Sequence, residues 1–149
     1  MYLFPMMNED ELIQKLGRIE ALFAGAKTEG EKNASVHALE RIQKKLSDLQ
    51  VDDPAVEYKF SMTNHWSKKL FIALLRRYGL KPYRYRRQRH TTVMVKISKS
   101  FVDETLWPEF TELDKTLNSY LESITSRIIS ESIFTDSEEM VLKEPKYLN

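Results

Sequence analysis

Residues 56–62 read Val-Glu-Tyr-Lys-Phe-Ser-Met, and they decide the fold class because the hydrophobic period of the chain changes there. Val56, Tyr58, Phe60 and Met62 alternate with polar residues, which is the two-residue repeat of a strand buried on one face. Elsewhere apolar residues recur mainly at spacings of three and four, as they do on one face of a helix. The sequence therefore predicts an α+β protein.

A helix is predicted directly after this strand. Thr63 or Asn64 can accept hydrogen bonds from the free N–H groups of its first turn, and Gly79 can end it after Tyr78. The apolar residues between these points recur at helical spacing. The polar side of the helix presents the cations Lys68, Lys69 and Arg76.

Two more strands are predicted after Pro82. In the first, Tyr83 and Tyr85 alternate with Arg84 and Arg86, and a polar turn follows over residues 87–90. In the second, Val93, Val95 and Ile97 alternate with Thr92, Met94 and Lys96. We expect the two tyrosines to share the core with the valines, because the opposite register would bury arginines.

Helices are predicted on both sides of this segment. Asn8 can cap a first helix over residues 9–24, and a second helix opens at Thr28 and ends before residue 52, so that the two form an antiparallel hairpin. Ser100 and Asp103 offer a capping box for the last, long helix. Pro108 suits its first turn or a kink within it.

The predicted organisation has three parts. Residues 1–50 form an N-terminal segment with the helical hairpin, residues 51–135 form an α+β domain, and residues 136–149 form a flexible tail. The domain has the order strand, helix, strand, strand, long helix. Its small three-stranded sheet is covered by helices on one face and leaves the other face open to solvent.

The charge of the chain is strongly polarised although its net charge is only +1. Twelve Lys and Arg residues and no Asp or Glu lie between Tyr58 and Val102. Such segregation creates a positive surface that attracts polyanions or acidic proteins. The predicted open face carries the cations Lys59, Arg84, Arg86 and Lys96, with Arg87 and Arg89 at the hairpin tip.

These cations predict a non-enzymatic protein that binds nucleic acid, either DNA or RNA, through its phosphates. The candidate binding residues are Arg84, Arg86, Arg87, Arg89 and Lys96, flanked by Lys68, Lys69 and Arg76. Tyrosines interleave with these arginines, but their predicted burial favours phosphate contact over base stacking and hence weak sequence preference. Replacing Arg84, Arg86 and Arg89 together by Gln should then abolish binding without unfolding the domain.

Three alternatives remain open for the positive segment. Its arginines can pair with acidic residues of the same chain and leave no net positive face, or they can dock an acidic protein partner, as an adaptor would. Asp52, Asp53 and Glu57 can hold magnesium beside the basic face, as in a nuclease. The sequence offers no other catalytic or cofactor signal: it has no cysteine and no glycine-rich phosphate loop, and His37, His65 and His90 lack metal spacing.

The apolar N-terminal residues affect the predictions of self-association and of cellular location. Leu3, Phe4, Met6 and Met7 are apolar and either pack on the domain or pair with a second copy, so a homodimer is left open. Pro5 interrupts this stretch well short of a signal-peptide core or a membrane span. We therefore expect a soluble, cytoplasmic protein.

Two patterns of the chain point to a resemblance: Glu-Lys-Asn-Ala at residues 31–34 with Ala38, Leu39 and Ile42 in the hairpin, and Trp-x-x-x-Leu at Trp66 and Leu70. On these residues, the chain from about Leu16 to Leu46 resembles the helical hairpin of a family of small, uncharacterised phage and bacterial proteins. A glycine expected before the final helix is replaced by Ser-Lys-Ser at residues 98–100. The resemblance implies the hairpin followed by a compact α+β segment and a bacterial or phage origin, and it implies no functional residue.

Overall fold

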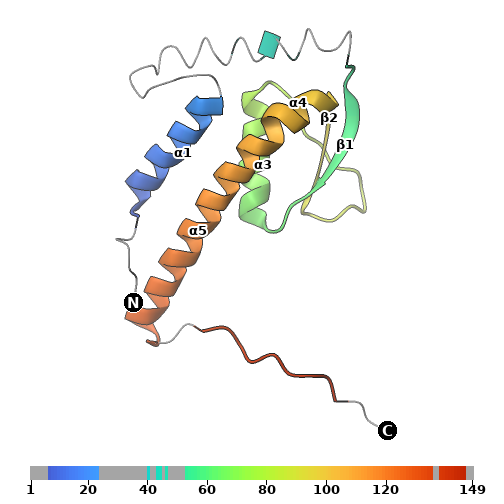
Figure 1. The fold of residues 1–149 in the computed structure, drawn as a ribbon. Coiled ribbons are helices and arrows are strands. Elements are labelled where there is room, and N and C mark those ends of the chain that lie inside the picture. The colour runs from blue at the N-terminus through green and yellow to red at the C-terminus, as the bar shows by residue number, and fades with distance from the viewer. Residues whose placement is uncertain are drawn as a thin grey trace.

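The computed structural model describes residues 7–23, 40, 43–44, 46, 53–135 and 138–146. Figure 1 shows the helices α1 (Glu9–Phe23), α3 (His65–Arg77), α4 (Lys99–Phe101) and α5 (Trp107–Ser132), and the strands β1 (Val56–Ser61) and β2 (Thr92–Ile97). The predicted α+β class is confirmed. The predicted second helix, and with it the hairpin, lies largely outside the described residues, although Glu40, Gln43, Lys44 and Leu46 are helical.

β1 and β2 form an antiparallel pair whose inner face is buried. Phe60 pairs with Val93 and Tyr58 pairs with Val95. Because paired residues point to the same side of a sheet, this register collects the apolar side chains of both strands on one face. Val93, Val95, Ile97 and Phe60 are buried there, which confirms these predicted core positions, whereas Tyr58 is half-buried and Val56 is 49% exposed.

The predicted third strand is wrong: among the described residues, which include 83–90, the sheet has two strands. Tyr83 and Met94 exchange two backbone hydrogen bonds, of 2.9 and 2.8 Å, on the edge of β2 away from β1. The next pair in such a ladder would be Tyr85 and Thr92. The N–H of Tyr85 instead donates to Gln88 Oε1 at 2.9 Å, and that of Thr92 donates to Arg89 O at 3.0 Å. The N–H groups of Tyr85 and Thr92 are therefore bonded within a turn and do not pair the two residues in a third strand.

The predicted burial of the tyrosines is also wrong, for a reason of register. Tyr83 stands opposite Met94 and not opposite a valine, so its side chain lies on the outer face of the sheet. Tyr83 is half-buried and Tyr85 is 51% exposed, whereas Thr92 and Met94 are buried. The outer face is thus partly covered, and it is not the open surface that the sequence predicts.

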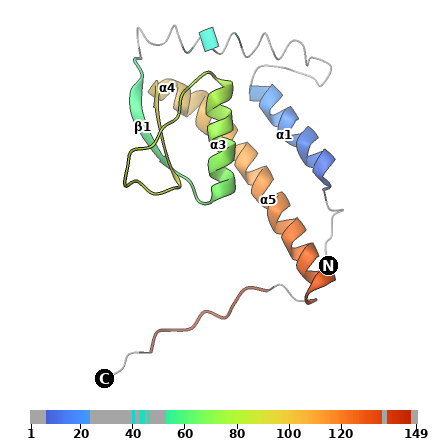
Figure 2. The same cartoon turned by 180° about the vertical axis from the view of Figure 1, so that it is seen from behind.

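Helices cover the inner face in two layers. Figures 1 and 2 show the sheet on one side of α3 and α5, and α1 on the other side, antiparallel to α5. Asn64 caps α3 by accepting a bond from Ser67 N at 2.8 Å, and Gly79 follows its end with a φ of 78°, as predicted. Phe71 of α3 is fully buried between Phe60 and Phe110, each 4.8 Å away between ring centroids.

The start of the last helix differs from the prediction. The expected capping box of Ser100 and Asp103 does not form, because Asp53 Oδ2 accepts bonds from Ser100 N, at 2.9 Å, and from Ser100 Oγ. The chain then passes from α4 through a π-helical turn, Val102–Leu106, into α5. Pro108 follows this turn and has no N–H for an ordinary helical bond.

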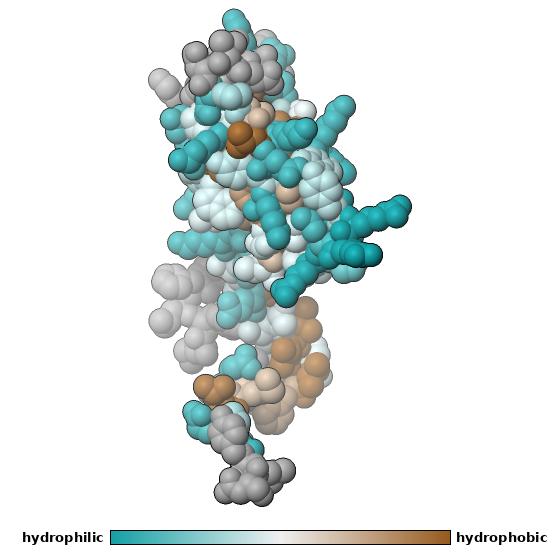
Figure 3. All heavy atoms as spheres, turned by 90° about the vertical axis from the view of Figure 1, so that its right-hand side faces the viewer, coloured by the Kyte–Doolittle hydropathy of each residue, from teal (hydrophilic) through white to brown (hydrophobic). Residues whose placement is uncertain are grey.

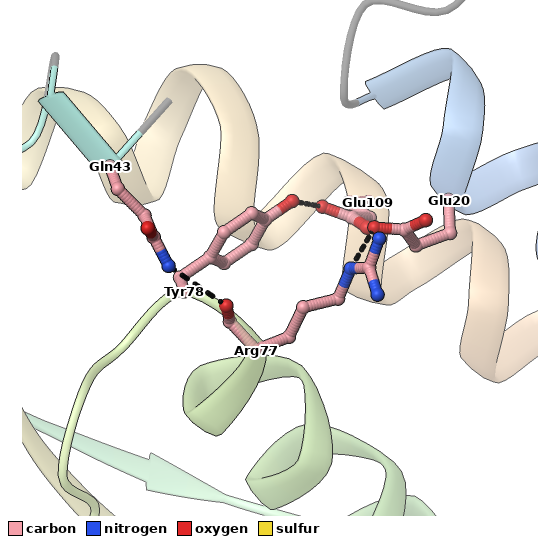
Figure 4. A network of polar contacts seen from close by, with 5 residues as sticks. All are labelled: Glu20, Gln43, Arg77, Tyr78 and Glu109. Atoms are coloured by element: carbon pink, nitrogen blue, oxygen red, sulfur yellow. Dashed lines mark hydrogen bonds and ion pairs between the residues drawn. The ribbon is translucent and has the colours of Figure 1, made fainter. Parts of the chain in front are cut away.

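A polar network that is buried at Tyr78 and Glu109 and reaches the surface at Arg77 joins α1, α3 and α5 (Figure 4). The hydroxyl of Tyr78 donates to Glu109 Oε2, and Arg77 Nε forms an ion pair with Glu20 of α1. The carboxyl groups of Glu20 and Glu109 lie side by side. Burial first, and then the charge of Glu20, raise the pKa of Glu109 to about 7, against the Tyr78 hydrogen bond and the charge of Arg77. The core therefore contains a carboxyl group that holds its proton near neutral pH.

The second half of α5 has no fully buried side chain, although several of its apolar side chains are half-buried. Its buried side chains are confined to the stretch from Glu109 to Thr116, and Ile128 is 50% exposed. Residues 138–146 form neither helix nor strand and are exposed. None of the described helices combines the length and the apolarity that a membrane span requires.

Candidate nucleic-acid interface

The basic residues after Tyr83 form an ordered loop, residues 84–90, which we call the arginine loop. Gln88 closes it, because its side chain accepts the N–H of Tyr85 and its own N–H donates to Tyr85 O at 3.3 Å. Arg87 takes the left-handed conformation, with a φ of 72°. A non-glycine residue adopts this conformation at some cost, so the surrounding hydrogen bonds determine the shape of the loop.

Glu57 of β1 anchors the base of the arginine loop. The hydroxyls of Tyr83 and Tyr85 both donate to Glu57 Oε2, and the two rings meet edge to face with centroids 5.6 Å apart. The Tyr83 bond first, and then the Tyr85 bond, hold the pKa of Glu57 below its usual value, while both tyrosine pKa values rise. At neutral pH the carboxylate is therefore ionised and both hydroxyls remain donors.

Removing this anchor should loosen the loop. We expect trypsin, which cleaves after Arg and Lys, to cut the arginine loop of a Glu57→Ala variant several-fold faster than that of the unmodified protein, because loop opening exposes these bonds. The measurement is a time course of limited proteolysis read by mass spectrometry. Glu112→Ala, which removes an exposed glutamate from α5, is the matched control. Equal cleavage rates in both variants would contradict the anchoring role.

The arginine loop displays its cations to solvent. Arg86, Arg87 and Arg89 are exposed, and none of them forms an ion pair with another described residue. Arg84 is exposed as well, but its Nη1 donates to Gln88 O at 2.5 Å and so also supports the loop. Figure 3 shows this side of the molecule, from which long hydrophilic side chains project. The loop therefore exposes four arginine side chains to solvent.

The other predicted binding residues are not gathered at the loop. Lys96 is exposed on the outer face of the sheet, but it stands opposite Glu57, whose charge it faces. Lys68, Lys69 and Arg76 belong to α3, which packs on the inner side of the sheet. Lys69 Nζ lies 5.6 Å from the ring centroid of the exposed Trp66. The candidate site is therefore the loop, with Lys96 beside it.

Among the described residues, neutralisation within the chain applies to some cations of the segment but not to those of the loop: Lys96 faces Glu57, and Arg77 forms an ion pair. Arg77 is bound by Glu20, as described above. No acidic side chain among the described residues pairs in this way with the four arginines of the loop. The positive charge of the loop is therefore available to a ligand.

The acidic residues considered for magnesium are separately engaged. Asp53 binds Ser100, whose side-chain hydrogen bond is the main cause that lowers the pKa of Asp53, and Glu57 binds the two tyrosines. Asp52 and His37 lie outside the described residues. Within the described ranges, no group of three or more His, Cys, Asp or Glu side chains is placed to hold a metal ion.

Sequence reasoning missed the residues that shape the loop. Gln88 reads as an ordinary turn residue, and Glu57 reads as a polar position of a strand. The anchoring role of Glu57 could have been predicted from the face of the sheet on which it lies. Glu57 pairs with Lys96, and so it lies on the same face as Met94. A tyrosine assigned to the same face would then be within reach of the carboxylate.

Comparisons with known proteins gave no match. No family model matches the chain, and neither a curated protein nor a solved structure matches it significantly. The phage and bacterial resemblance and the domain boundaries drawn from the sequence therefore stay predictions.

Proposed function

We propose that the protein is a non-enzymatic binding protein that holds DNA or RNA by its phosphates at the arginine loop. The observation that supports this most is the set of exposed arginines on a loop of determined shape, with no described acid paired to them. Like charges so close together repel, and a polyanion relieves that repulsion while it releases its own counterions.

The residue type favours phosphate as the ligand group. All four cations of the loop are arginines, whose planar guanidinium can donate two parallel bonds to one phosphate. Such contacts fix position on the backbone and carry no sequence information, so weak sequence preference is expected. Lys96 extends the positive surface along the sheet, whereas the α3 cations contribute only to the long-range field.

The test replaces Arg86, Arg87 and Arg89 together by Gln. Arg84 is kept because it bonds to the loop backbone. Fluorescence anisotropy with labelled duplex and single strands of random sequence should show affinity that falls with salt, at a log–log slope of about −0.9 per phosphate neutralised on duplex. The variant should lose about three phosphate contacts, and its slope should become shallower by about 3.

The matched control removes the same charge elsewhere. Lys115 and Arg127 of α5 and Lys143 are exposed, and their joint replacement by Gln should leave binding almost unchanged. Circular dichroism checks that both triple variants are folded. Equal loss in the two variants would mean that only net charge matters, and the proposal would be wrong. Absence of binding to every nucleic acid, together with a partner retained in a pull-down from nuclease-treated lysate, would favour the acidic protein partner.

A further inference from the structure

Tyr85 is an exposed aromatic ring held in place inside the arginine loop. Its hydroxyl donates to Glu57, its N–H donates to Gln88 Oε1, and its ring meets the edge of Tyr83. About half of its surface, 51%, nevertheless remains exposed. The ring is thus fixed through both its backbone and its hydroxyl while part of it faces water.

Such a fixed ring is suited to stacking on a base. An exposed ring that is already immobilised loses little conformational freedom when a planar ligand stacks on it. Its neighbours in sequence are Arg84 and Arg86, so a strand whose phosphates contact the arginines would carry its bases close to the ring. Burial of the tyrosines was the reason for expecting no stacking, and the structure removes that reason.

Stacking distinguishes single strands from duplex. In a duplex the bases already stack on one another and present only their edges in the grooves, whereas the bases of a single strand offer their faces. We propose that the arginine loop prefers single-stranded nucleic acid over duplex and that Tyr85 is the platform on which an unpaired base stacks. This inference rests on the proposed function, because the same arginines hold the phosphates.

The experiment compares three labelled probes of equal length by fluorescence anisotropy: a thymidine single strand, the same strand with abasic sugars, and a duplex. The unmodified protein should bind the thymidine strand more tightly than the abasic strand, by roughly 5- to 100-fold for one stacked base. Tyr85→Leu should lose that preference and keep its salt slope, because the arginines are retained. Tyr85→Phe loses the same bond to Glu57 but keeps the ring, so any loss of duplex affinity through a looser loop should be equal in both variants. The preference of Tyr85→Phe for bases should fall between those of Tyr85→Leu and the unmodified protein.

Controls separate this inference from the proposed function. Trp66→Leu removes another exposed ring, outside the loop, and should leave the preference for bases intact. Equal affinity of the unmodified protein for thymidine and abasic strands, with binding still dependent on the arginines, would overturn the stacking inference alone. Loss of the preference in Trp66→Leu and not in Tyr85→Leu would also overturn it. Failure of all three probes to bind would instead overturn the proposed function.

Discussion

Replacing Glu109 by Gln should make the protein about 3 kcal/mol more stable at pH 8 and change its stability far less at pH 5. Glu109 is fully buried and its pKa is raised from 4.5 to about 7. At a pH between these two pKa values, most of the unfolded chain has lost the Glu109 proton while most of the native protein keeps it. The native state therefore binds more protons, and the free energy of unfolding falls as pH rises. The full loss above neutral pH is about 3 kcal/mol.

A glutamine avoids this loss because it is neutral at every pH. Its side-chain oxygen can still accept the hydroxyl of Tyr78, and its amide puts a donor beside the carboxylate of Glu20, at the end of the side chain where Glu109 Oε1 has no hydrogen-bond partner. Arg77 remains paired with Glu20 in both proteins. The carboxylates Asp53 and Glu57 act in the opposite sense, but their pKa values are lowered, so their contribution is lost only at more acidic pH.

Urea denaturation between pH 5 and pH 8 measures this effect. The difference in free energy of unfolding between Glu109→Gln and the unmodified protein should be about 1 kcal/mol or less at pH 5 and about 3 kcal/mol at pH 8. Glu112→Gln, on the exposed side of α5, should show no such dependence. A difference that stays constant over this range would show that Glu109 is ionised in the native state.

Replacing Phe71 by Ala should cost about 3–5 kcal/mol of stability, as truncation of a large buried aromatic side chain does. Phe71 has no exposed surface, and it meets the rings of Phe60 and Phe110 edge to face. It therefore joins β1, α3 and α5, and the cavity left by its removal lies between all three. A loss of this size is a large part of the 5–15 kcal/mol that stabilises a typical domain.

The measurement is again urea denaturation, in which the midpoint should fall while the slope stays the same. Trp66→Ala provides the comparison, because it removes a larger aromatic side chain from the same helix at a half-exposed position. Its cost should be about 1 kcal/mol or less. If the two variants lost equal stability, the ring cluster around Phe71 would not be the centre of the core.

The sequence was sufficient to predict elements whose signals come from residues close together in the chain. The alternation at residues 56–62, the cap at Asn64 and the stop at Gly79 each depend on residues next to one another, and the structure contains all three. The first helix likewise begins where Asn8 accepts the N–H of Glu11 at 2.8 Å. The positive segment was also visible, because charge density is a property of the sequence itself.

Predictions failed where distant residues compete with local ones. Asp53 binds Ser100 from 47 positions away and replaces the expected capping box. In the same way, Gln88 takes the N–H of Tyr85 that a third strand would have used. Each local pattern was real, but another residue made the hydrogen bond, and no spacing rule shows which will prevail.

The burial of Glu109 could also have been predicted from the sequence. It lies three residues after Leu106 and four before Leu113, so it falls within the apolar stripe of the last helix. A carboxyl group at such a position must be buried, and a buried carboxyl group needs a partner or a proton. The partner, Tyr78, could not be identified from spacing because it follows a different helix.

The π-helical turn before Pro108 sets the rotational phase of α5. Its last bond runs from Trp107 N–H to Val102 O, five residues back, so the turn contains one more residue than an α-helical turn. Deleting one residue there would rotate everything that follows by about 100° around the helix axis. Glu109 and Phe110 would then turn away from the interior together, and their partners, Tyr78 and Phe71, would face the wrong side of the helix.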